Sequence, residues 1–237
     1  MNVPVKTLDG FKVFCSEEKF APEFETVRNA LLNRTGKILG DRMDAPKRKR
    51  LIILATIAGT PVVLKRELFV FRFDRSLKAL LFGSDAKNIF NLSLRAQEHG
   101  FKKIPKTFLI AEKFSGGVLR ETISVTEFLE GNALRPPFSP KRIEEIKNLL
   151  TECHQNGIIS GDIQFDNFIA TPEGIKLIDF RGNKIFPWLA KARDRLQLEF
   201  TFEISLEKYG LAEKFFLTQN RFRNFCRKLR GKPPQHS

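Results

Sequence analysis

Residues 158–182 read I-I-S-G-D-I-Q-F-D-N-F-I-A-T-P-E-G-I-K-L-I-D-F-R-G, and this segment says most about the fold of the 237-residue chain. Asp162 is followed five residues later by Asn167. Two short apolar stretches on either side of the turn 171–174 predict a tight β-hairpin, whose second strand leads directly into Asp179. We expect this hairpin to bring Asp162, Asn167 and Asp179 to one place.

These three side chains are of the types that phosphoryl transfer requires. A carboxylate can accept the proton of the acceptor hydroxyl, and hard oxygen ligands hold Mg²⁺ on the phosphates of ATP. We assign Asp162 as the base or orienting group and Asn167 and Asp179 as metal ligands, in the pattern of the D-x-x-x-x-N and D-F-G motifs of protein kinases and aminoglycoside-type kinases. Taken singly, Asp162 and Asn167 would be explained as turn residues and Asp179 as a residue that caps a strand, but their order and spacing together favour a kinase.

An amphipathic helix is predicted immediately before this loop. Ser139 is a favourable N-cap with Pro140 at the first helical position, and Gly157 is a natural end. The residues between them carry one apolar stripe. His154, on the same helix, is interpreted as structural. Beyond Trp188 the chain is again predicted to be helical.

The first half of the chain predicts a small sheet with one helix. The expected elements are strands over 51–57 and 61–64, a helix over 84–99, and strands over 108–113 and 119–128. A Pro-rich stretch, 135–137, then marks a change of character. The fold class we expect is α+β, a two-lobed protein-kinase-like fold with a β-rich N-terminal lobe, residues 1–131, and a mainly helical C-terminal lobe, residues 132–237.

Three residues of the first half are candidates for binding ATP. Lys65 ends the second predicted strand, in V-V-L-K, where a kinase places the lysine that holds the α- and β-phosphates. Glu127 and Leu129 lie where the last of these strands ends. A solvated lysine at a strand end is the alternative for Lys65, and the downstream motifs favour the functional role.

Two parts of the kinase pattern are weak. No G-x-G-x-x-G motif is present, and Gly36 and Gly40 in T-G-K-I-L-G are a poor substitute. The predicted helix over 84–99 has Asn91, and not Glu, near its centre, although kinases pair their strand lysine with a helix Glu. The partner of Lys65 is therefore left open.

The composition bounds the partners and the compartment. The formal net charge is +14, which suits nucleic acid, an anionic membrane surface or a polyanionic substrate. Cys15, Cys153 and Cys226 lie far apart, so neither a disulfide framework nor a zinc site is predicted, and the reduced thiols of a cytoplasmic protein are expected. The longest apolar run, residues 51–58, is too short to span a bilayer, and no secretory signal follows Met1. We expect a soluble or peripheral protein.

The sequence resembles the lipopolysaccharide core heptose kinases of Gram-negative bacteria, the type that acts on the second heptose. The resemblance covers about residues 52–228, and its most specific segments are H-Q-N-G-I-I-S-G-D at 154–162 and K-A-R-D-R-L-Q-L-E at 191–199. It implies phosphorylation of a heptose hydroxyl of the inner core with ATP and Mg²⁺, at the cytoplasmic face of the inner membrane. It also implies that Asp194 braces the catalytic loop. Gln164 is a departure, because protein kinases often have Lys at this position.

The C-terminal segment predicts a basic amphipathic helix. The apolar residues expected on one face are Leu211, Phe215, Phe222, Phe225 and Leu229. The basic residues expected to flank them are Arg221, Arg223, Arg227, Lys228 and Arg230. Such a helix can lie on an anionic membrane surface, and the alternative is a packed helix of the second lobe. The expected partners are the lipopolysaccharide core acceptor and an anionic membrane surface. Nucleic acid is not expected, because no recognised binding motif accompanies the charge.

Two other functions remain open on the sequence. A small atypical serine/threonine kinase, acting on a protein or on a tRNA-modification complex, would share the G-D-x-x-x-x-N and D-F patterns. A catalytically inactive kinase fold would act as a binding module. Such a module would be expected to lack Asp162, Asn167 or Asp179, and all three are present.

Overall fold

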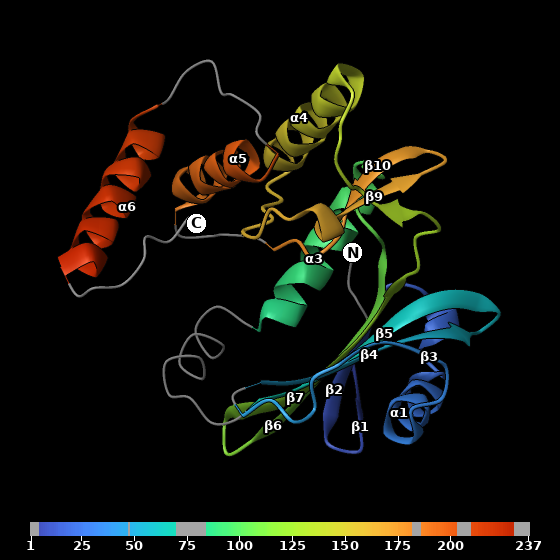
Figure 1. Cartoon of the computed structure of the whole chain (residues 1–237). Coiled ribbons are helices and arrows are strands. Elements are labelled where there is room, and N and C mark those ends of the chain that lie inside the picture. The colour runs from blue at the N-terminus through green and yellow to red at the C-terminus, as the bar shows by residue number, and fades with distance from the viewer. Residues whose placement is uncertain (1–4, 47, 70–83, 182–185, 203–209, 230–237) are drawn as a thin grey trace. The chain divides into compact units, whose positions relative to one another are not determined.

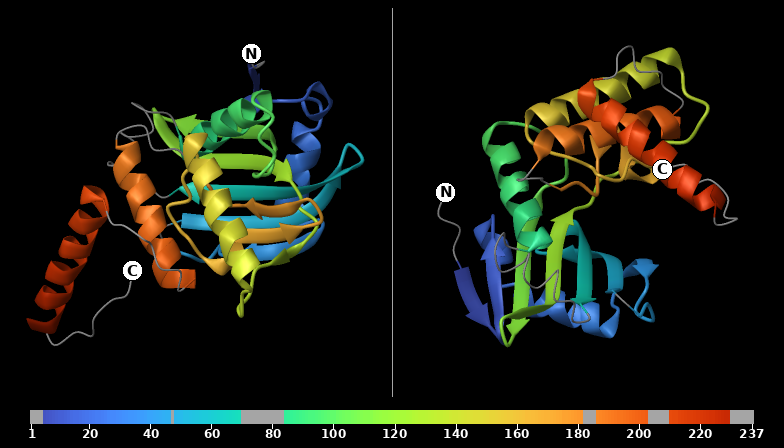
Figure 2. Two further views of the ribbon diagram at one scale, coloured as in Figure 1. Left: turned by 90° about the horizontal axis from the view of Figure 1, so that it is seen from above. Right: turned by 90° about the vertical axis from the view of Figure 1, so that its left-hand side faces the viewer.

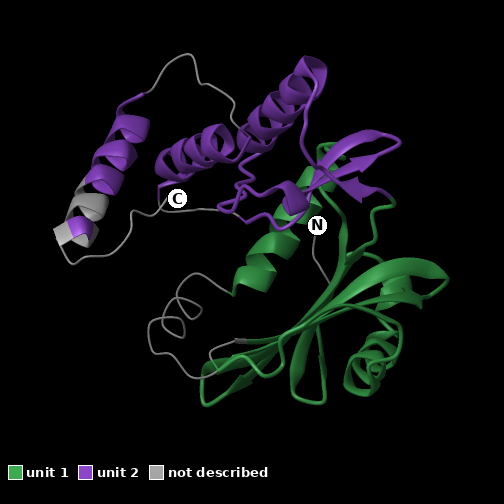
Figure 3. Cartoon of the chain, viewed as in Figure 1, with its two compact units in different colours: residues 1–130 green, residues 131–237 purple. Residues whose placement is uncertain are grey.

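The computed structural model of the chain describes residues 5–46, 48–69, 84–181, 186–202 and 210–229 (Figure 1). The chain forms two compact units, residues 1–130 and 131–237 (Figure 3). The first unit is dominated by β-structure and the second by helices. The α+β class predicted from the sequence is therefore confirmed.

The first unit is built on a seven-stranded sheet with the order β1-β2-β6-β7-β5-β4-β3, in which all neighbouring strands are antiparallel. The strands are β1 (Val5–Leu8), β2 (Phe11–Cys15), β3 (Lys37–Asp41), β4 (Arg48–Ile57), β5 (Thr60–Phe69), β6 (Thr107–Ser115) and β7 (Val118–Glu127). The hairpin between β4 and β5 turns at Ala58 and Gly59, which both have positive φ, as a tight two-residue turn requires.

Strand β5 is longer than the sequence predicted. We expected it to end at Lys65, but it continues to Phe69. The residues after Lys65 continue the alternation of side chains and pair with β4 on one side and β7 on the other. Lys65 therefore lies in the middle of an internal strand, opposite Ile52 and Ser124, and not at an exposed strand end.

Each face of this sheet carries a helix (Figure 2). Among the described residues of the unit, the helical elements are η1 (Glu18–Phe20), α1 (Phe24–Asn33) and α3 (Asp85–Glu98). On one face, Val27 and Leu31 of α1 enter the main apolar core of the unit. On the opposite face, Phe90 of α3 packs against Phe14 and Ile110. Burial of these side chains on both faces holds the sheet between two helical layers.

The prediction of one helix in this unit was wrong, because α1 was not predicted from the sequence. Strands β1 to β3 were also not predicted. Helix α1 begins behind Glu23 without a side-chain cap and ends at Arg34 in the left-handed conformation, where a glycine is usual. The usual start and stop signals are thus absent from the sequence. Helix α3 has its predicted start, because the Ser84 hydroxyl accepts a hydrogen bond from the N–H of Lys87 (3.0 Å).

In its described part, the second unit contains three α-helices and a three-stranded sheet with the order β10-β9-β8. The elements are β8 (Asn132–Ala133), α4 (Pro140–Gln155), η2 (Phe165–Asn167), β9 (Phe168–Thr171), β10 (Gly174–Leu177), α5 (Pro187–Phe202) and α6 (Leu211–Leu229). The predicted cap of α4 is present, since the Ser139 hydroxyl accepts a hydrogen bond from the N–H of Arg142 (3.2 Å). The predicted hairpin is β9–β10, with Phe168 opposite Leu177.

A buried carboxylate ties α6 to α5. Glu213, in the first turn of α6, accepts hydrogen bonds from Nε (2.7 Å) and Nη2 of Arg195. Burial alone would raise the pKa of Glu213, but Arg195 and the backbone hydrogen bonds at Gly210 and Glu213 lower it more, so the pKa lies below its usual value. The ion pair is therefore formed at neutral pH. No helix within the described ranges has the length and apolar character needed to cross a bilayer.

The cysteines that the structure describes are buried thiols. Neither Cys15 nor Cys153 forms a disulfide. Burial raises the pKa of Cys15 to about 11, against a smaller opposing effect of Lys6. Its thiolate is therefore scarce at neutral pH, and the thiol acts as an apolar core group. The side chain of Cys226 lies outside the described residues.

Candidate active site

The loop that carries Asp162 is anchored at its start to both α4 and the segment after β10. At the end of α4, the N–H of Ile158 donates to the carbonyl of Cys153 (2.9 Å). Ile159 then forms an isolated antiparallel bridge with Arg181, through two backbone hydrogen bonds of 2.8 and 2.6 Å. The bridge fixes the start of the Asp162 loop to the residues that follow Asp179.

The three predicted polar residues are brought together within the second unit. The side-chain amide of Asn167 donates from Nδ2 to the backbone carbonyl of Asp162 (2.7 Å). The backbone carbonyl of Asn167 in turn accepts from the N–H of Ile178 (2.9 Å), the residue directly before Asp179. Asn167 therefore connects the Asp162 loop, through its side chain, to the strand end that carries Asp179, through its backbone carbonyl.

Gln164 orients the Asp162 carboxylate. Its Nε2 donates a hydrogen bond to Oδ1 of Asp162 (2.9 Å). Asp162 is half-buried and Gln164 is exposed. A neutral amide at this position holds the carboxylate by a hydrogen bond and supplies no positive charge, unlike the lysine of many protein kinases.

One face of α5 holds the backbone on both sides of Asp162. The buried Asp194 carboxylate accepts hydrogen bonds from the N–H groups of Ser160 (2.8 Å) and Gly161 (2.7 Å). Gln197 Oε1 accepts from the N–H of Ile163 (3.4 Å). The Thr201 hydroxyl donates to the carbonyl of the same Ile163 (3.0 Å).

These three α5 residues are spaced at i, i+3 and i+7, which places them on one side of a helix. Asp194 was assigned to bracing the loop through the family resemblance, whereas Gln197 and Thr201 were missed. Their signal in the sequence was the helical spacing of polar residues on a helix that must also bury apolar ones. His154, interpreted as structural, contacts the same carboxylate, with Nε2 3.2 Å from Oδ2 of Asp194.

Gly161, directly before Asp162, has no room for a side chain. Its φ is +68°, and a Cβ would lie 2.7 Å from Nε of Arg181. The Arg181 side chain occupies this place because its Nε donates to the carbonyl of Ser160 (3.1 Å). Both the backbone conformation and the packing therefore require glycine here.

Asp179 has an unusual backbone conformation at the end of the hairpin. Its φ is +52°, its side chain is exposed, and the following Phe180 is buried. The left-handed region costs an ordinary residue roughly 1–2 kcal/mol, although Asp and Asn tolerate it better than most. Such strained residues concentrate at functional sites, because the surrounding structure must hold them in place.

The donor set of this loop suits Mg²⁺ held partly by substrate phosphates. Because the amide nitrogen of Asn167 is engaged with Asp162, its Oδ1 is the atom left for a cation. Within the described residues no group of three or more His, Cys, Asp or Glu side chains is arranged to hold a metal ion. Mg²⁺ needs no such cage, since it is commonly bound by one or two protein oxygens together with phosphates and water.

The candidate ATP-binding residues all belong to the first unit. Lys65 lies on β5, on the face of the sheet that carries Phe14, Ile110 and α3. Glu127 ends β7, and its carboxylate accepts a hydrogen bond from the N–H of Lys106 (3.0 Å). Leu129 follows in a segment without regular structure that leads to the second unit.

Gly36 serves packing and not a phosphate loop. Its φ is +120°, and a Cβ would lie 2.5 Å from the backbone oxygen of Leu54 on β4. Gly40 lies within β3, next to an irregularity in the pairing with β4. Neither glycine belongs to a G-x-G-x-x-G turn, in agreement with the weak motif.

The first unit contains a sheet with an internal lysine, and the second is a helical unit in which a D-x-x-x-x-N loop meets a hairpin that ends in Asp. Together these features define a protein-kinase-like phosphotransferase fold. A solved structure, "WaaP in complex with acyl carrier protein", has the same fold, with a TM-score of 0.54 and 17% identity over 89% of this chain and 88% of that one. The model of the WaaY family, lipopolysaccharide core biosynthesis proteins, matches residues 10–232, and the chain belongs to this family.

Named relatives agree with the family. The lipopolysaccharide core heptose(II) kinase WaaY of Escherichia coli K12 is 28% identical over 166 residues, which is 69% of this chain and 71% of that protein. A second Escherichia coli protein of the same name is 30% identical, over 68% of this chain and 70% of that one. A mouse sperm motility kinase, Tcr mutant form, is 30% identical over 54% of this chain but only 24% of its own length.

Proposed function

We propose that this chain is a kinase of lipopolysaccharide core biosynthesis that transfers a phosphoryl group from ATP to a heptose hydroxyl. The observation that carries the proposal is membership of the WaaY family together with the loop in which Asp162, Asn167 and Asp179 converge. The Escherichia coli relatives are named as heptose(II) kinases. The chemistry of the loop suits a sugar hydroxyl as acceptor, because a carboxylate must take its proton.

Each residue has a defined part in this mechanism. Asp162, oriented by Gln164, accepts or orients the proton of the heptose hydroxyl. Asn167 and Asp179 hold Mg²⁺, which neutralises charge on the phosphates. Asp194 and its neighbours on α5 keep the Asp162 loop in one conformation. Lys65 binds the α- and β-phosphates, and the segment with Glu127 and Leu129 binds the adenine end of ATP.

The function is tested by mass spectrometry of the core oligosaccharide from a strain that lacks this protein. We expect the core to lose one phosphate on a heptose, and the wild-type gene to restore it. The same gene with Asp162→Asn should fail to restore it, although the variant is expressed. An unchanged phosphate content of the heptoses would contradict the proposal. Loss of phosphate from another core sugar would show that the acceptor is that sugar and not a heptose.

We further propose that α6 brings the enzyme to the anionic membrane in which its acceptor is embedded, at the cytoplasmic face of the inner membrane. At the start of α6, the apolar stripe faces away from the rest of the second unit. Leu211 and Phe215 are 87% and 57% exposed, whereas Ala212 and Glu213 are buried against the unit. Exposed apolar side chains on a basic helix favour binding to an anionic surface over a purely structural role.

The basic side chains of α6 that the structure describes support this surface. Lys214, Arg221 and Lys228 are exposed. Arg223 and Arg227, and the apolar side chains predicted at 222, 225 and 229, lie outside the described side chains, and Arg230 lies outside the described residues. Binding to vesicles is therefore best tested by replacing Leu211 and Phe215, whose side chains the structure describes.

Replacing Leu211 and Phe215 together with Gln is expected to weaken binding to anionic vesicles by at least about tenfold, because two apolar side chains no longer enter the lipid interface. Vesicle flotation with phosphatidylglycerol and with phosphatidylcholine measures the effect. Ile38→Gln with Leu39→Gln is the matched control, since these two residues are 46% and 48% exposed on β3 of the other unit. Equal binding of wild type and the α6 variant would show that the helix is only a part of the second unit.

A further inference from the structure

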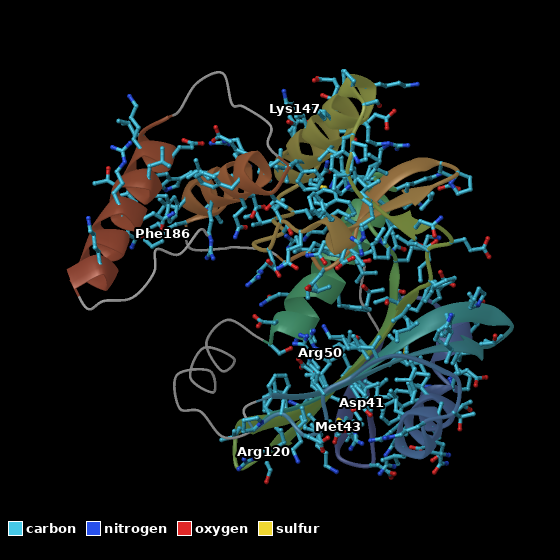
Figure 4. The ribbon with its side chains drawn as sticks, viewed as in Figure 1. Asp41, Met43, Arg50, Arg120, Lys147 and Phe186 are labelled. Atoms are coloured by element: carbon cyan, nitrogen blue, oxygen red, sulfur yellow. The ribbon has the colours of Figure 1, made fainter. Side chains whose placement is uncertain are left out.

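A buried carboxylate lies beside the proposed phosphate-binding lysine. Glu67 is two residues after Lys65 on β5 and is only 6% exposed. Its Oε1 is 3.4 Å from Nζ of Lys65 and accepts a hydrogen bond from Nε of Arg50 (3.0 Å). Arg50 lies on β4, and its side chain is labelled in Figure 4. In the part of the chain that the structure describes, this is the carboxylate with which Lys65 forms its ion pair.

The position of Glu67 on the sheet explains why its side chain meets Lys65. Residues two apart on a strand point to the same face. Glu67 stands opposite Arg50 on one side and Thr122 on the other, in the row next to Lys65 and Ser124. This is the face covered by α3, where kinases of this class place the carboxylate that pairs with the strand lysine.

Helix α3 does not offer that carboxylate at its centre. Its acidic residues, Asp85 and Glu98, are the first and the last residues of the helix, and Asn91 lies midway. Glu67 supplies instead a carboxylate from the strand itself. A charge as buried as that of Glu67 must be paired, so it restrains the cations that pair with it.

We propose that Glu67 is the positioning residue for Lys65, in the place of a helix glutamate. The inference rests on the proposed role of Lys65 in binding the phosphates of ATP. Because both residues belong to one strand, the lysine is held by the sheet, and its placement needs no movement of α3. Glu67 acts on ATP only through Lys65.

Four variants of the full chain test the inference: Glu67→Gln, Lys65→Met, the two combined, and Glu121→Gln. Glu121 is the matched control, because its carboxylate pairs with Arg66 (2.6 Å), the neighbour of Lys65 on the opposite face of β5. Affinity for MgATP is measured by calorimetry, and KM for MgATP and for the acceptor by steady-state kinetics.

Glu67→Gln is expected to weaken MgATP binding and raise the KM for MgATP about tenfold, with an unchanged KM for the acceptor. The double variant should be no weaker than Lys65→Met alone, because Glu67 has no effect without Lys65. Glu121→Gln should bind MgATP like wild type. If Glu67→Gln does not fold, Glu67→Asp keeps the charge but shortens the side chain, and it should show the same selective loss for MgATP.

Three kinds of contrary result are distinguishable. Wild-type MgATP affinity in Lys65→Met would overturn the proposed role of Lys65 and with it the inference. A loss in Lys65→Met that Glu67→Gln does not share, or losses that simply add in the double variant, would overturn the role of Glu67 alone. Loss of affinity for the acceptor as well as for MgATP would show a general structural role for Glu67.

Discussion

Turnover is expected to fall about 10²–10⁴-fold when Asp162 is replaced by Asn, while binding of ATP is largely retained. Asn has the shape of Asp, so the hydrogen bond to Gln164 is expected to persist. The hydrogen bonds from α5 to the backbone on both sides of residue 162 are also expected to persist. What is lost is the carboxylate that we propose takes the acceptor proton. Single-turnover kinetics with the dephosphorylated core as acceptor measures the chemical step, and MgATP binding is measured separately.

Asp166→Asn is the control for this substitution. Asp166 lies in the same loop, is exposed, and pairs with Arg135, so loss of its charge should leave turnover near that of wild type. Near-normal turnover of Asp162→Asn would show that another group takes the proton. A large loss in Asp166→Asn would show that the effect belongs to the charge of the loop and not to Asp162.

Replacing Asp179 is expected to lower activity by at least about 10²-fold and to abolish the Mg²⁺-dependent part of ATP affinity, because we propose its carboxylate as the charged ligand of the metal. Asp179→Ala removes the ligand, but Ala is poorly suited to the φ of +52° at this position. Asp179→Asn keeps a residue that tolerates this conformation and removes only the charge. Nucleotide binding at increasing Mg²⁺ concentration is the measurement.

The Asn and Ala variants should therefore agree in their loss of Mg²⁺ response and differ in their melting temperatures. Glu173→Gln is the control, because Glu173 is an exposed carboxylate in the turn of the same hairpin and pairs with Lys176 (2.9 Å). An Asp179→Asn variant whose ATP affinity responds to Mg²⁺ like wild type would remove Asp179 from the metal site.

Several elements were predictable because their signals lie within a few residues. Ser84 and Ser139 cap α3 and α4 as expected, since each hydroxyl meets an N–H three residues later. The turn at 171–174 defines the β9–β10 hairpin for the same local reason. Helix α1 lacks both a cap and a terminal glycine, so its stability depends on apolar contacts with the sheet, which local signals do not contain.

The contacts around Asp162 also divide into those implied by local sequence and those that depend on tertiary packing. The link from Asn167 to the carbonyl of Asp162 spans five residues and is implied by the spacing of the motif. Gln197 and Thr201 reach Ile163 across 34 and 38 residues, so their role appears only when α5 packs against the loop. The role of Asp194 came from a family resemblance, and periodicity alone would not have separated it from a solvated helix residue.

By itself, the sequence determined the kinase class, the convergence of Asp162, Asn167 and Asp179, and the helix before them, because these depend on motif spacing, caps and a tight turn. Only the tertiary structure decided the surroundings of Lys65. The pattern Lys-x-Glu on an edge strand would leave both side chains in water, where such a pair contributes little. Because β5 lies between β4 and β7, Glu67 is buried next to Arg50 and Lys65, and burial is what turns an ordinary ion pair into a fixed one.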